Sequence, residues 1–201
     1  MDVTDRSDDA GLARALADDL DAAFERLVRD QVDRLYSIAL RLTGDRRDAE
    51  EIAQDALVRA YRALSTYDAE RITALRLRPW LTTICLNAAR NRRRRQADRQ
   101  PPVSLSVVAV DPDAGPLVDA GAGPEAAATA ASERDRWAAL LGQLPRRYRE
   151  PVILRHVDEL SYLEMAEVLG RSEGTLRAQV HRGLAMLRAA WEAAERTEAI
   201  A

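Results

Sequence analysis

Residues 160–191, LSYLEMAEVLGRSEGTLRAQVHRGLAMLRAAW, decide the fold. Ser161 and Glu164 have the S-x-x-E spacing of a capping box, in which each side chain bonds the other residue's backbone amide, so a helix is predicted to begin there. Gly170 permits the left-handed turn that ends this helix. Ser172 is predicted to cap the next one. A short helix, a glycine turn and a longer helix together predict a helix-turn-helix motif.

The apolar residues of this motif recur every three or four positions, as expected for amphipathic helices. The inward residues predicted for the first helix are Met165, Ala166 and Leu169, and those for the second are Leu176, Val180, Leu184, Leu187 and Trp191. The early outward positions are those at which a recognition helix meets base edges and phosphates: Ser172, Glu173, Thr175, Arg177, Ala178, His181 and Arg182. A plain helical hairpin is the alternative, but the capping box and the polar outward face favour DNA reading.

The residues before the motif also predict helices. Ser132 is expected to cap a segment that turns Trp137, Leu140 and Leu141 inward. Pro145 is expected to start a further helix, with Tyr148, Val152, Ile153 and Val157 on its apolar side.

The N-terminal half is helical as well, because glycine and proline are almost absent from residues 12–78. A first apolar stripe runs through Phe24, Leu27, Val28, Val32, Leu35, Ile38, Ala39 and Leu42. Gly44 is the predicted stop of that helix and Asp45 the predicted N-cap of the next. The next apolar stripe is Ile52, Ala56, Leu57, Ala60 and Leu64, and the opposite face is polar: Asp48, Glu50, Glu51, Gln54 and Asp55.

A third helix is predicted to begin at Pro79. Its inward residues are Leu81, Ile84, Cys85 and Ala88, and its outward residues are Thr83, Asn87, Arg90, Asn91 and Arg94. Charge is concentrated here: residues 76–99 contain eight arginines against Asp98 alone, whereas residues 1–25 contain eight acids and two arginines. Two interpretations of the run at 92–95 stay open on charge alone, a solvated helix end and a surface that meets phosphates.

Composition excludes several function classes. Cys85 is the single cysteine, so no disulfide framework and no paired-thiol motif is expected. His156 and His181 have no cysteine partners at metal-ligand spacing, so we expect no metal site. Glycine-rich phosphate loops, G-x-S-x-G and isolated acid–base pairs are lacking, so we expect neither an enzyme nor a cofactor. No apolar run suits a membrane span, and a cytoplasmic protein is expected.

Residues 98–130 separate the two helical halves. They contain five prolines and scattered acids without a sustained period, which is typical of a linker. The sequence therefore predicts an all-α protein with two small helical domains that are tethered rather than fused. The predicted boundaries are an acidic tail at 1–20, a first domain at 21–97, the linker at 98–130, a second domain at 131–195 and a tail at 196–201.

Three motifs, in order along residues 22–193, resemble the sigma-70 family. DAEEIAQDALVRAYRAL at 48–64 resembles sigma region 2.2, and RPWLTTICLNAARNRRRR at 78–95 resembles the promoter-melting helix that follows it. Residues 144–188 are similar to region 4. Two helical domains without a third between them resemble the extracytoplasmic-function (ECF) sigma factors. Glu173, Ala178, Gln179 and Gly183 depart from the usual region 4 pattern and leave the promoter sequence open.

The resemblance implies partners and roles that spacing alone does not give. The implied partners are core RNA polymerase, through its largest-subunit clamp helices and its flap, promoter DNA, and an anti-sigma factor, with no membrane insertion. The implied clamp-binding residues are Asp48, Glu51, Gln54, Asp55, Leu57 and Tyr61. The residues implied to hold the −10 element and the melted strand are Arg76, Arg78, Trp80, Thr83, Asn87, Arg90, Asn91 and Arg94, with the arginines at 90–95 along the backbone. The outward residues of the helix-turn-helix are then implied to read the −35 element.

Two other interpretations remain at this point. A free-standing helix-turn-helix regulator with an N-terminal sensor or dimerisation domain would bind duplex DNA without polymerase. A nucleic-acid enzyme would need a catalytic constellation, which the sequence lacks.

Overall fold

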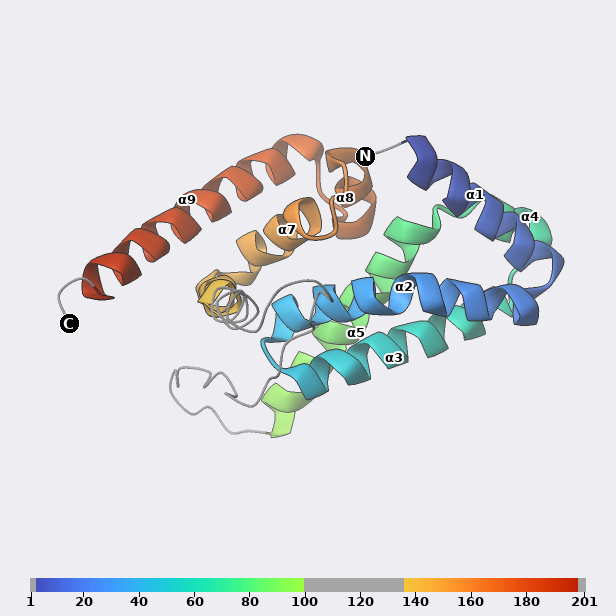
Figure 1. Ribbon diagram of the computed structural model, residues 1–201, viewed down its shortest axis with the longest axis horizontal. Coiled ribbons are helices and arrows are strands. Elements are labelled where there is room, and N and C mark those ends of the chain that lie inside the picture. The colour runs from blue at the N-terminus through green and yellow to red at the C-terminus, as the bar shows by residue number, and fades with distance from the viewer. Residues whose placement is uncertain (1–2, 100–135, 199–201) are drawn as a thin grey trace, which may run out of the picture.

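The computed structural model describes residues 3–99 and 136–198, and the regular structure there is entirely helical (Figure 1). The all-α prediction is thus confirmed. The helices are α1 (Val3–Asp18), α2 (Leu20–Thr43), α3 (Arg46–Leu64), α4 (Ala69–Thr73), α5 (Leu77–Arg99), α7 (Arg146–His156), α8 (Tyr162–Leu169) and α9 (Glu173–Glu198). Residues 136–143 are helical too. No described helix is long and apolar enough to cross a membrane. The predicted cap at Ser132 and nearly all of the predicted linker lie outside the described residues.

The N-terminal half is a bundle in which α2, α3 and α5 pack together (Figure 1). Its centre is filled by leucine and isoleucine side chains that are fully buried: Leu27, Leu35, Ile38, Ile52, Leu77 and Leu81. The turn between α2 and α3 is formed as predicted. Gly44 has a φ of +75°, and its amide donates to the Leu40 carbonyl, which ends α2. Asp45 then accepts a hydrogen bond from the Asp48 amide at 2.7 Å, which starts α3.

Residues 3–18, expected to belong to an acidic tail, instead form α1. Leu12, Ala13 and Leu16 are buried in the core of the N-terminal half, where α1 packs against α4 and α2. This apolar stripe is hard to detect in the sequence, because it consists of only three buried residues and acidic residues lie at the outward positions around them. The structured N-terminal half therefore begins well before residue 21.

Helix α5 begins at Leu77, two residues before the expected start at Pro79. Proline is compatible with the first turn of a helix, because residues there donate no backbone hydrogen bond within the helix and the missing amide hydrogen costs nothing. The α5 helix then continues to Arg99, slightly beyond the predicted domain boundary at residue 97.

The C-terminal half contains the predicted helix-turn-helix, formed by α8 and α9. The Ser161 hydroxyl caps the Glu164 amide and the Glu164 carboxylate accepts from the Ser161 amide at 2.7 Å, so the capping box is confirmed. Gly170 ends α8 with a φ of +65°. The Ser172 hydroxyl accepts from the Thr175 amide at 3.3 Å, as expected for the cap of α9.

Two inward residues predicted for this half are exposed instead. Leu184 is 38% exposed and Trp137 is 45% exposed, although Trp137 stacks on Trp191 at a ring distance of 4.8 Å. The buried stripe of α9 passes through Gly183 rather than Leu184, because the bare backbone there lies against α7. A Cβ on Gly183 would lie 2.6 Å from Cγ2 of Val152, so the close approach depends on glycine. A prediction from apolar periodicity places Leu184 rather than Gly183 in the buried stripe, because leucine is the more apolar residue, and this prediction is wrong.

The two halves, expected to be tethered only, pack against each other. Helix α8 contacts α5, and α7 contacts α2. The side chain of Leu86 on α5 joins a buried cluster whose other buried members come from the C-terminal half: Leu154, Leu160, Met165, Val168, Leu176 and Val180. The sequence shows each apolar stripe but not which stripe of one half meets the other.

Replacing Ser161 by alanine is expected to lower the free energy of unfolding by about 1 kcal/mol, because the Glu164 amide loses its side-chain acceptor and the Glu164 carboxylate loses the hydroxyl donor. Urea unfolding followed by far-UV circular dichroism measures this change. In the control Ser65→Ala, an exposed hydroxyl that donates to the Tyr61 carbonyl at a helix end is removed, and a change below about 0.5 kcal/mol is expected. Equal losses in both variants would contradict the role given to the capping box.

Candidate nucleic-acid interface

One exposed face of α3 combines acids, an amide and two apolar residues. Glu51 and Gln54 are exposed and Asp55 is half-buried. Val58 and Tyr61 are 47% and 38% exposed. This face presents both charge and apolar surface to solvent, as a protein-binding surface does.

Leu57, predicted to belong to this face, is only 7% exposed and packs in the core. It is four residues after Ala53 and three before Ala60, both buried, so helical spacing places it inward. Val58 is the exposed apolar residue that the sequence analysis missed. Its spacing from Gln54 and Tyr61, four and three residues, is the signal that could have found it.

Tyr61 is fixed at the edge of this face. Its hydroxyl donates to the Asp21 carboxylate at 2.7 Å, and its ring packs edge-on against Phe24 at 5.0 Å. The hydrogen bond to Asp21 raises the pKa of Tyr61, because ionisation would remove the donor and place two negative charges together. The aromatic ring is therefore held in one orientation before any partner binds.

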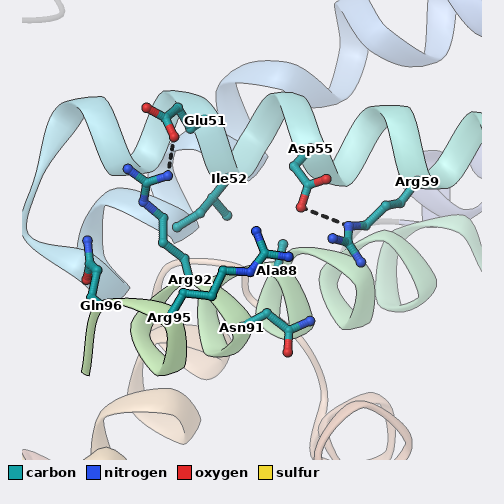
Figure 2. A pocket seen from close by; sticks show the side chains of 9 residues that line it. All are labelled: Glu51, Ile52, Asp55, Arg59, Ala88, Asn91, Arg92, Arg95 and Gln96. Carbon is teal, nitrogen blue, oxygen red and sulfur yellow. Dashed lines mark hydrogen bonds and ion pairs between the residues drawn. The ribbon is translucent and has the colours of Figure 1, made fainter. Parts of the chain in front are cut away.

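The acidic end of α3 is joined to the basic end of α5 by Arg92. The guanidinium donates to Asp48 at 2.7 Å. It also pairs with Glu51, as Figure 2 shows. Gln96 donates to the second oxygen of Asp48 at 2.7 Å. Burial alone would raise the pKa of Asp48, but the hydrogen bonds from Arg92 and Gln96 outweigh it and hold the pKa below its ordinary value. Arg92 thus connects the two helices and is not free for phosphate.

A pocket of about 400 Å³ lies between α3 and α5 beside this pair (Figure 2). Glu51, Ile52, Asp55 and Arg59 line it from α3, and Ala88, Asn91, Arg92, Arg95 and Gln96 line it from α5. The floor is apolar and the rim carries both signs of charge. Acids predicted to meet a protein and arginines predicted to meet DNA are thus brought together at one groove.

The rest of the arginine run is open to solvent. Arg93, Arg94 and Arg95 are exposed, and so is Asn87 one turn or more before them on α5. Within the part of the chain that the structure describes, these three arginines form no ion pair. These three guanidinium groups project in different directions around the end of α5, so each can bind a phosphate from its own side of the helix.

Three other arginines predicted to meet DNA instead bind carboxylates of the C-terminal half. Arg76 pairs with Glu164 at 2.6 Å and with Glu167 at 2.7 Å. Arg90 makes two hydrogen bonds to Glu150, at 3.2 and 2.8 Å. The Nε of Arg78 lies 3.6 Å from the Asp158 carboxylate, and the Arg78 guanidinium donates to the Asp158 backbone carbonyl at 2.7 Å. Sequence reasoning missed all four of these ion-pair partners, and identified Glu164 only as part of the capping box, because no local pattern connects the acids to residues some 60 to 90 positions earlier.

The remaining predicted residues on α5 are partly enclosed. Trp80 is half-buried and lies 6.4 Å from the ring of Tyr67, on which Arg71 stacks at 3.6 Å. The Thr83 hydroxyl donates to the Pro79 carbonyl at 2.9 Å. Asn91 is half-buried at the groove. Trp80, Thr83 and Asn91 therefore lie against neighbouring groups of the protein and are only partly open to solvent.

The outer face of α9 is exposed at its N-terminal end, as predicted. Ser172, Thr175, Arg177, Ala178, His181 and Arg182 are exposed, and Glu173 is half-buried. Arg177 pairs with Glu173 at 3.0 Å and lies over the ring of Tyr162, 4.7 Å from its centre. Pairs between exposed groups four residues apart are weak, so Arg177 can exchange its carboxylate for a base or a phosphate.

No group of three metal-ligating side chains occurs among the described residues. Cys85 is buried, and burial raises the pKa of its thiol to about 12. This thiol is therefore protonated at neutral pH and structural in character.

Family comparison gives two matches that together span most of the described chain. Residues 27–99 match the model of sigma-70 region 2, and residues 134–187 match that of sigma-70, region 4. The ECF RNA polymerase sigma factor SigW of Bacillus subtilis is 29% identical over 83% of this chain and 87% of that protein. The RNA polymerase sigma factor NccH of Alcaligenes xylosoxydans xylosoxydans is 31% identical over 93% and 96%.

Structural comparison agrees. CnrH, solved in complex with the cytosolic domain of CnrY, is similar to this chain with a TM-score of 0.66 and 26% identity. The similarity covers 92% of this chain and 97% of CnrH.

Replacing Arg92 by glutamine is expected to lower the free energy of unfolding by about 1 kcal/mol at neutral pH, because Asp48 and Glu51 lose their shared partner. Arg94→Gln, which removes an equal charge from an exposed site, is expected to change it by less than about 0.5 kcal/mol. The pKa of Asp48 is lowered from 3.8 in the folded state, so its contribution is present above pH 3.8 and is lost as the pH falls below that value.

Urea unfolding at neutral pH and at a pH below 3.8 measures both effects. The difference between the two variants should shrink in acid. A difference that persists undiminished in acid would exclude an ionic role for Arg92.

Proposed function

The chain belongs to the sigma-70 family, as an ECF sigma factor with regions 2 and 4, and on that premise we propose a role for each of its exposed faces. Sigma factors of this kind are transcription initiation factors rather than enzymes, and they direct RNA polymerase to promoters. We assign α1–α5 to region 2 and the helices from residue 136 onward to region 4. A free-standing regulator would leave the region 2 match at residues 27–99 without an explanation.

The exposed face of α3 is proposed to bind the clamp helices of the largest polymerase subunit. Its central residues are Glu51, Gln54, Asp55 and Val58, and Tyr61 borders them. The observation that supports this is the mixed character of the face, which combines charge with an apolar residue that is 47% exposed. Apolar area supplies binding free energy, and the acids orient the partner.

The arginine run of α5 is proposed to follow the phosphates of the melted promoter strand. Arg93, Arg94 and Arg95 are exposed without ion pairs in the described structure, and Asn87 is exposed on the same helix. Single strands are bound by charge along the backbone together with stacking and polar contacts to bases. Trp80 and Tyr67 offer the aromatic surface near the beginning of α5.

The N-terminal end of α9 is proposed to enter the major groove of the −35 element. Arg177 and Arg182 supply guanidinium groups for guanine edges or phosphates, and Ser172 and Thr175 supply hydroxyls at the helix start. The helix N-terminus adds its own partial positive charge toward phosphate.

A regulatory protein partner is also proposed. CnrH was solved with the cytosolic domain of CnrY bound. An anti-sigma factor that covers comparable surfaces of this chain would keep it from the polymerase, and Leu163 on α8, which is 57% exposed, offers one apolar contact.

Core binding tests the assignment of α3. The double variant Asp55→Arg with Val58→Arg is expected to weaken core binding at least tenfold, which is about 1.4 kcal/mol, while circular dichroism stays unchanged because both side chains face outward. Glu51 is left in place, since an arginine there would repel Arg92, which connects α3 to α5. The variant does remove the pair of Asp55 with Arg59, but this is an exposed pair four residues apart and contributes little to stability. The control Glu70→Arg reverses an exposed acid on α4. Fluorescence-monitored titration with purified core measures the affinities, and wild-type affinity in the double variant would contradict the assignment.

Promoter opening tests the assignment of α5. Replacing Arg93, Arg94 and Arg95 by glutamine is expected to lower open-complex formation on duplex promoters and to reduce its dependence on salt, because fewer phosphate contacts release fewer counterions. Arg92 is retained, so that α5 stays joined to α3.

A template already mismatched over the start region should restore part of the loss, since the cost of melting is removed. Permanganate footprinting with core polymerase measures opening on both templates. Wild-type opening by the triple variant across a salt series would show that the run is only a solvated helix end.

A further inference from the structure

Four arginines lie where the C-terminal part of α5 contacts the beginning of α7. Arg90 and Arg93 belong to α5, and Arg146 and Arg149 belong to α7. The two members of each pair are three residues apart, so they share a face of their helix. Arg90 joins the helices by two hydrogen bonds to Glu150, at 3.2 and 2.8 Å. The four guanidinium groups therefore form one basic cluster at the junction of α5 and α7.

Glu150 is the only carboxylate with which these four arginines pair among the described residues, and it is already engaged. Its side chain is 3% exposed, and it accepts from Arg146 at 2.6 Å as well as from Arg90. Burial alone would raise the pKa of Glu150, but the hydrogen bonds from Arg90 and Arg146 outweigh it and lower the pKa. Glu150 is thus an ionised acid that two guanidinium groups share, and it leaves Arg93 and Arg149 without an acidic partner.

Arg149 is a half-buried cation that binds carbonyl groups instead of an acid. It donates to the Leu42 carbonyl at 3.3 Å and to the Leu144 carbonyl at 3.0 Å, and it also donates to the Gly142 carbonyl. Its Nε is buried and has no hydrogen-bond partner in the described structure. Carbonyl groups carry partial charges only. A guanidinium removed from water without a counterion is costly, so Arg149 is incompletely compensated.

Arg93 adds a second uncompensated charge beside it. The side chain is exposed and forms no ion pair within residues 3–99 and 136–198. Burial lowers the pKa of Arg149, and the positive charge of Arg93 lowers it further, while Glu150 offsets these effects only in part. Arg93 and Arg149 are therefore close enough to repel each other, and one of them is open to solvent.

The chemistry of the cluster selects its ligand. Guanidinium groups bind phosphate oxygens through charge-assisted hydrogen bonds in parallel pairs. A tetrahedral phosphate group directs its oxygens to several sides, so it can accept from donors on two helices at once. Its negative charge would also remove the repulsion between Arg93 and Arg149, which is stronger beside a half-buried group than in water.

We propose that the junction of α5 and α7 is an oxyanion site, in which a phosphate group bridges Arg93 of region 2 and Arg149 of region 4. The phosphate group belongs either to a free oligophosphate or to a nucleic-acid backbone, since both present the same oxygens. The site does not depend on the contact of α5 with the melted promoter strand, because it concerns the chain without polymerase. A ligand that binds this junction stabilises the folded chain, as any ligand specific for the native state does.

Four variants with equal net charge test the position of the site. Arg93→Gln and Arg149→Gln each remove one of the two bridging groups. The matched controls are Arg94→Gln on α5 and Arg147→Gln on α7, which remove exposed neighbouring charges. Arg147 lies over the ring of Tyr148, 4.7 Å from its centre, and pairs with no acid in the part of the chain that the structure describes.

Isothermal titration calorimetry of the full chain with sodium tripolyphosphate measures binding. Thermal unfolding compares tripolyphosphate with sodium chloride at equal ionic strength, which separates binding from screening. We expect saturating tripolyphosphate to raise the wild-type melting temperature by about 3 °C relative to chloride. Arg93→Gln and Arg149→Gln should bind it about tenfold more weakly, and the two controls as the wild type does.

Arg149→Gln also removes hydrogen bonds to three carbonyl groups. Should this variant fail to fold by circular dichroism, Arg93→Gln decides alone, because its side chain is exposed. Tripolyphosphate that stabilises the wild type no more than chloride would overturn the site. Equal affinity in Arg93→Gln and Arg94→Gln would overturn it as well, since binding would then follow net charge and not position.

Fluorescence anisotropy with a labelled single-stranded DNA oligonucleotide distinguishes the two sources of the phosphate group. If a backbone phosphate occupies the site, Arg149→Gln weakens oligonucleotide binding, Arg147→Gln does not, and tripolyphosphate competes with the oligonucleotide. If the ligand is a free oligophosphate, Arg149→Gln loses tripolyphosphate binding and keeps wild-type affinity for the oligonucleotide. Failure of the site leaves the role of α5 in promoter opening intact, because that role is measured with core polymerase on duplex promoters.

Discussion

The buried carboxylate of Asp158, between Arg34, Arg78 and Thr82, is the interaction on which the arrangement of the two regions depends. An ionised acid without these partners could not remain in the interior. All of these partners belong to region 2, and the α7–α8 turn, in which Glu159 has a positive φ, directs Asp158 toward them. The same pairing brings α8 against α5 and allows Leu86 to enter the cluster of region 4. The ion pairs of Asp158, the backbone of the α7–α8 turn and the burial of Leu86 therefore all favour the packing of region 4 against region 2.

The arginines of α5 lie in three different surroundings. Arg92 faces α3 and binds Asp48 and Glu51, Arg90 faces region 4 and binds Glu150, and Arg93–Arg95 face solvent. A basic helix end thus contains paired, structural arginines and exposed ones without an ion pair in the described structure side by side. Arg90 and Arg92 have structural partners, whereas contact with nucleic acid is a proposal for Arg93–Arg95.

The local features of the fold could be predicted from the sequence because their causes are local. Gly44, Asp45, the Ser161–Glu164 capping box and Gly170 all act within four residues, and the structure forms each as expected. Predictions were wrong where a distant surface decides. Leu184 is exposed because Gly183, without a side chain, is the residue that fits against Val152. The acidic segment at residues 3–18 is a helix whose Leu12 and Leu16 are buried, because α1 packs against α4 and α2. The contact between the regions depends on acids far from their arginines in sequence, so no periodicity could indicate it.

The central claim, that the buried Asp158 contact holds the two regions together, is tested most directly by a distance between the regions. Cys85 is buried and its pKa is raised to about 12, so the native thiol stays unreactive while spin labels are attached at Arg62→Cys on α3 and Arg188→Cys on α9. Pulsed electron paramagnetic resonance should give a single narrow distance for this labelled chain, and a broader and longer distribution when Asp158→Asn is added. A distribution in the Asp158→Asn variant as narrow and short as that of its parent would contradict the account.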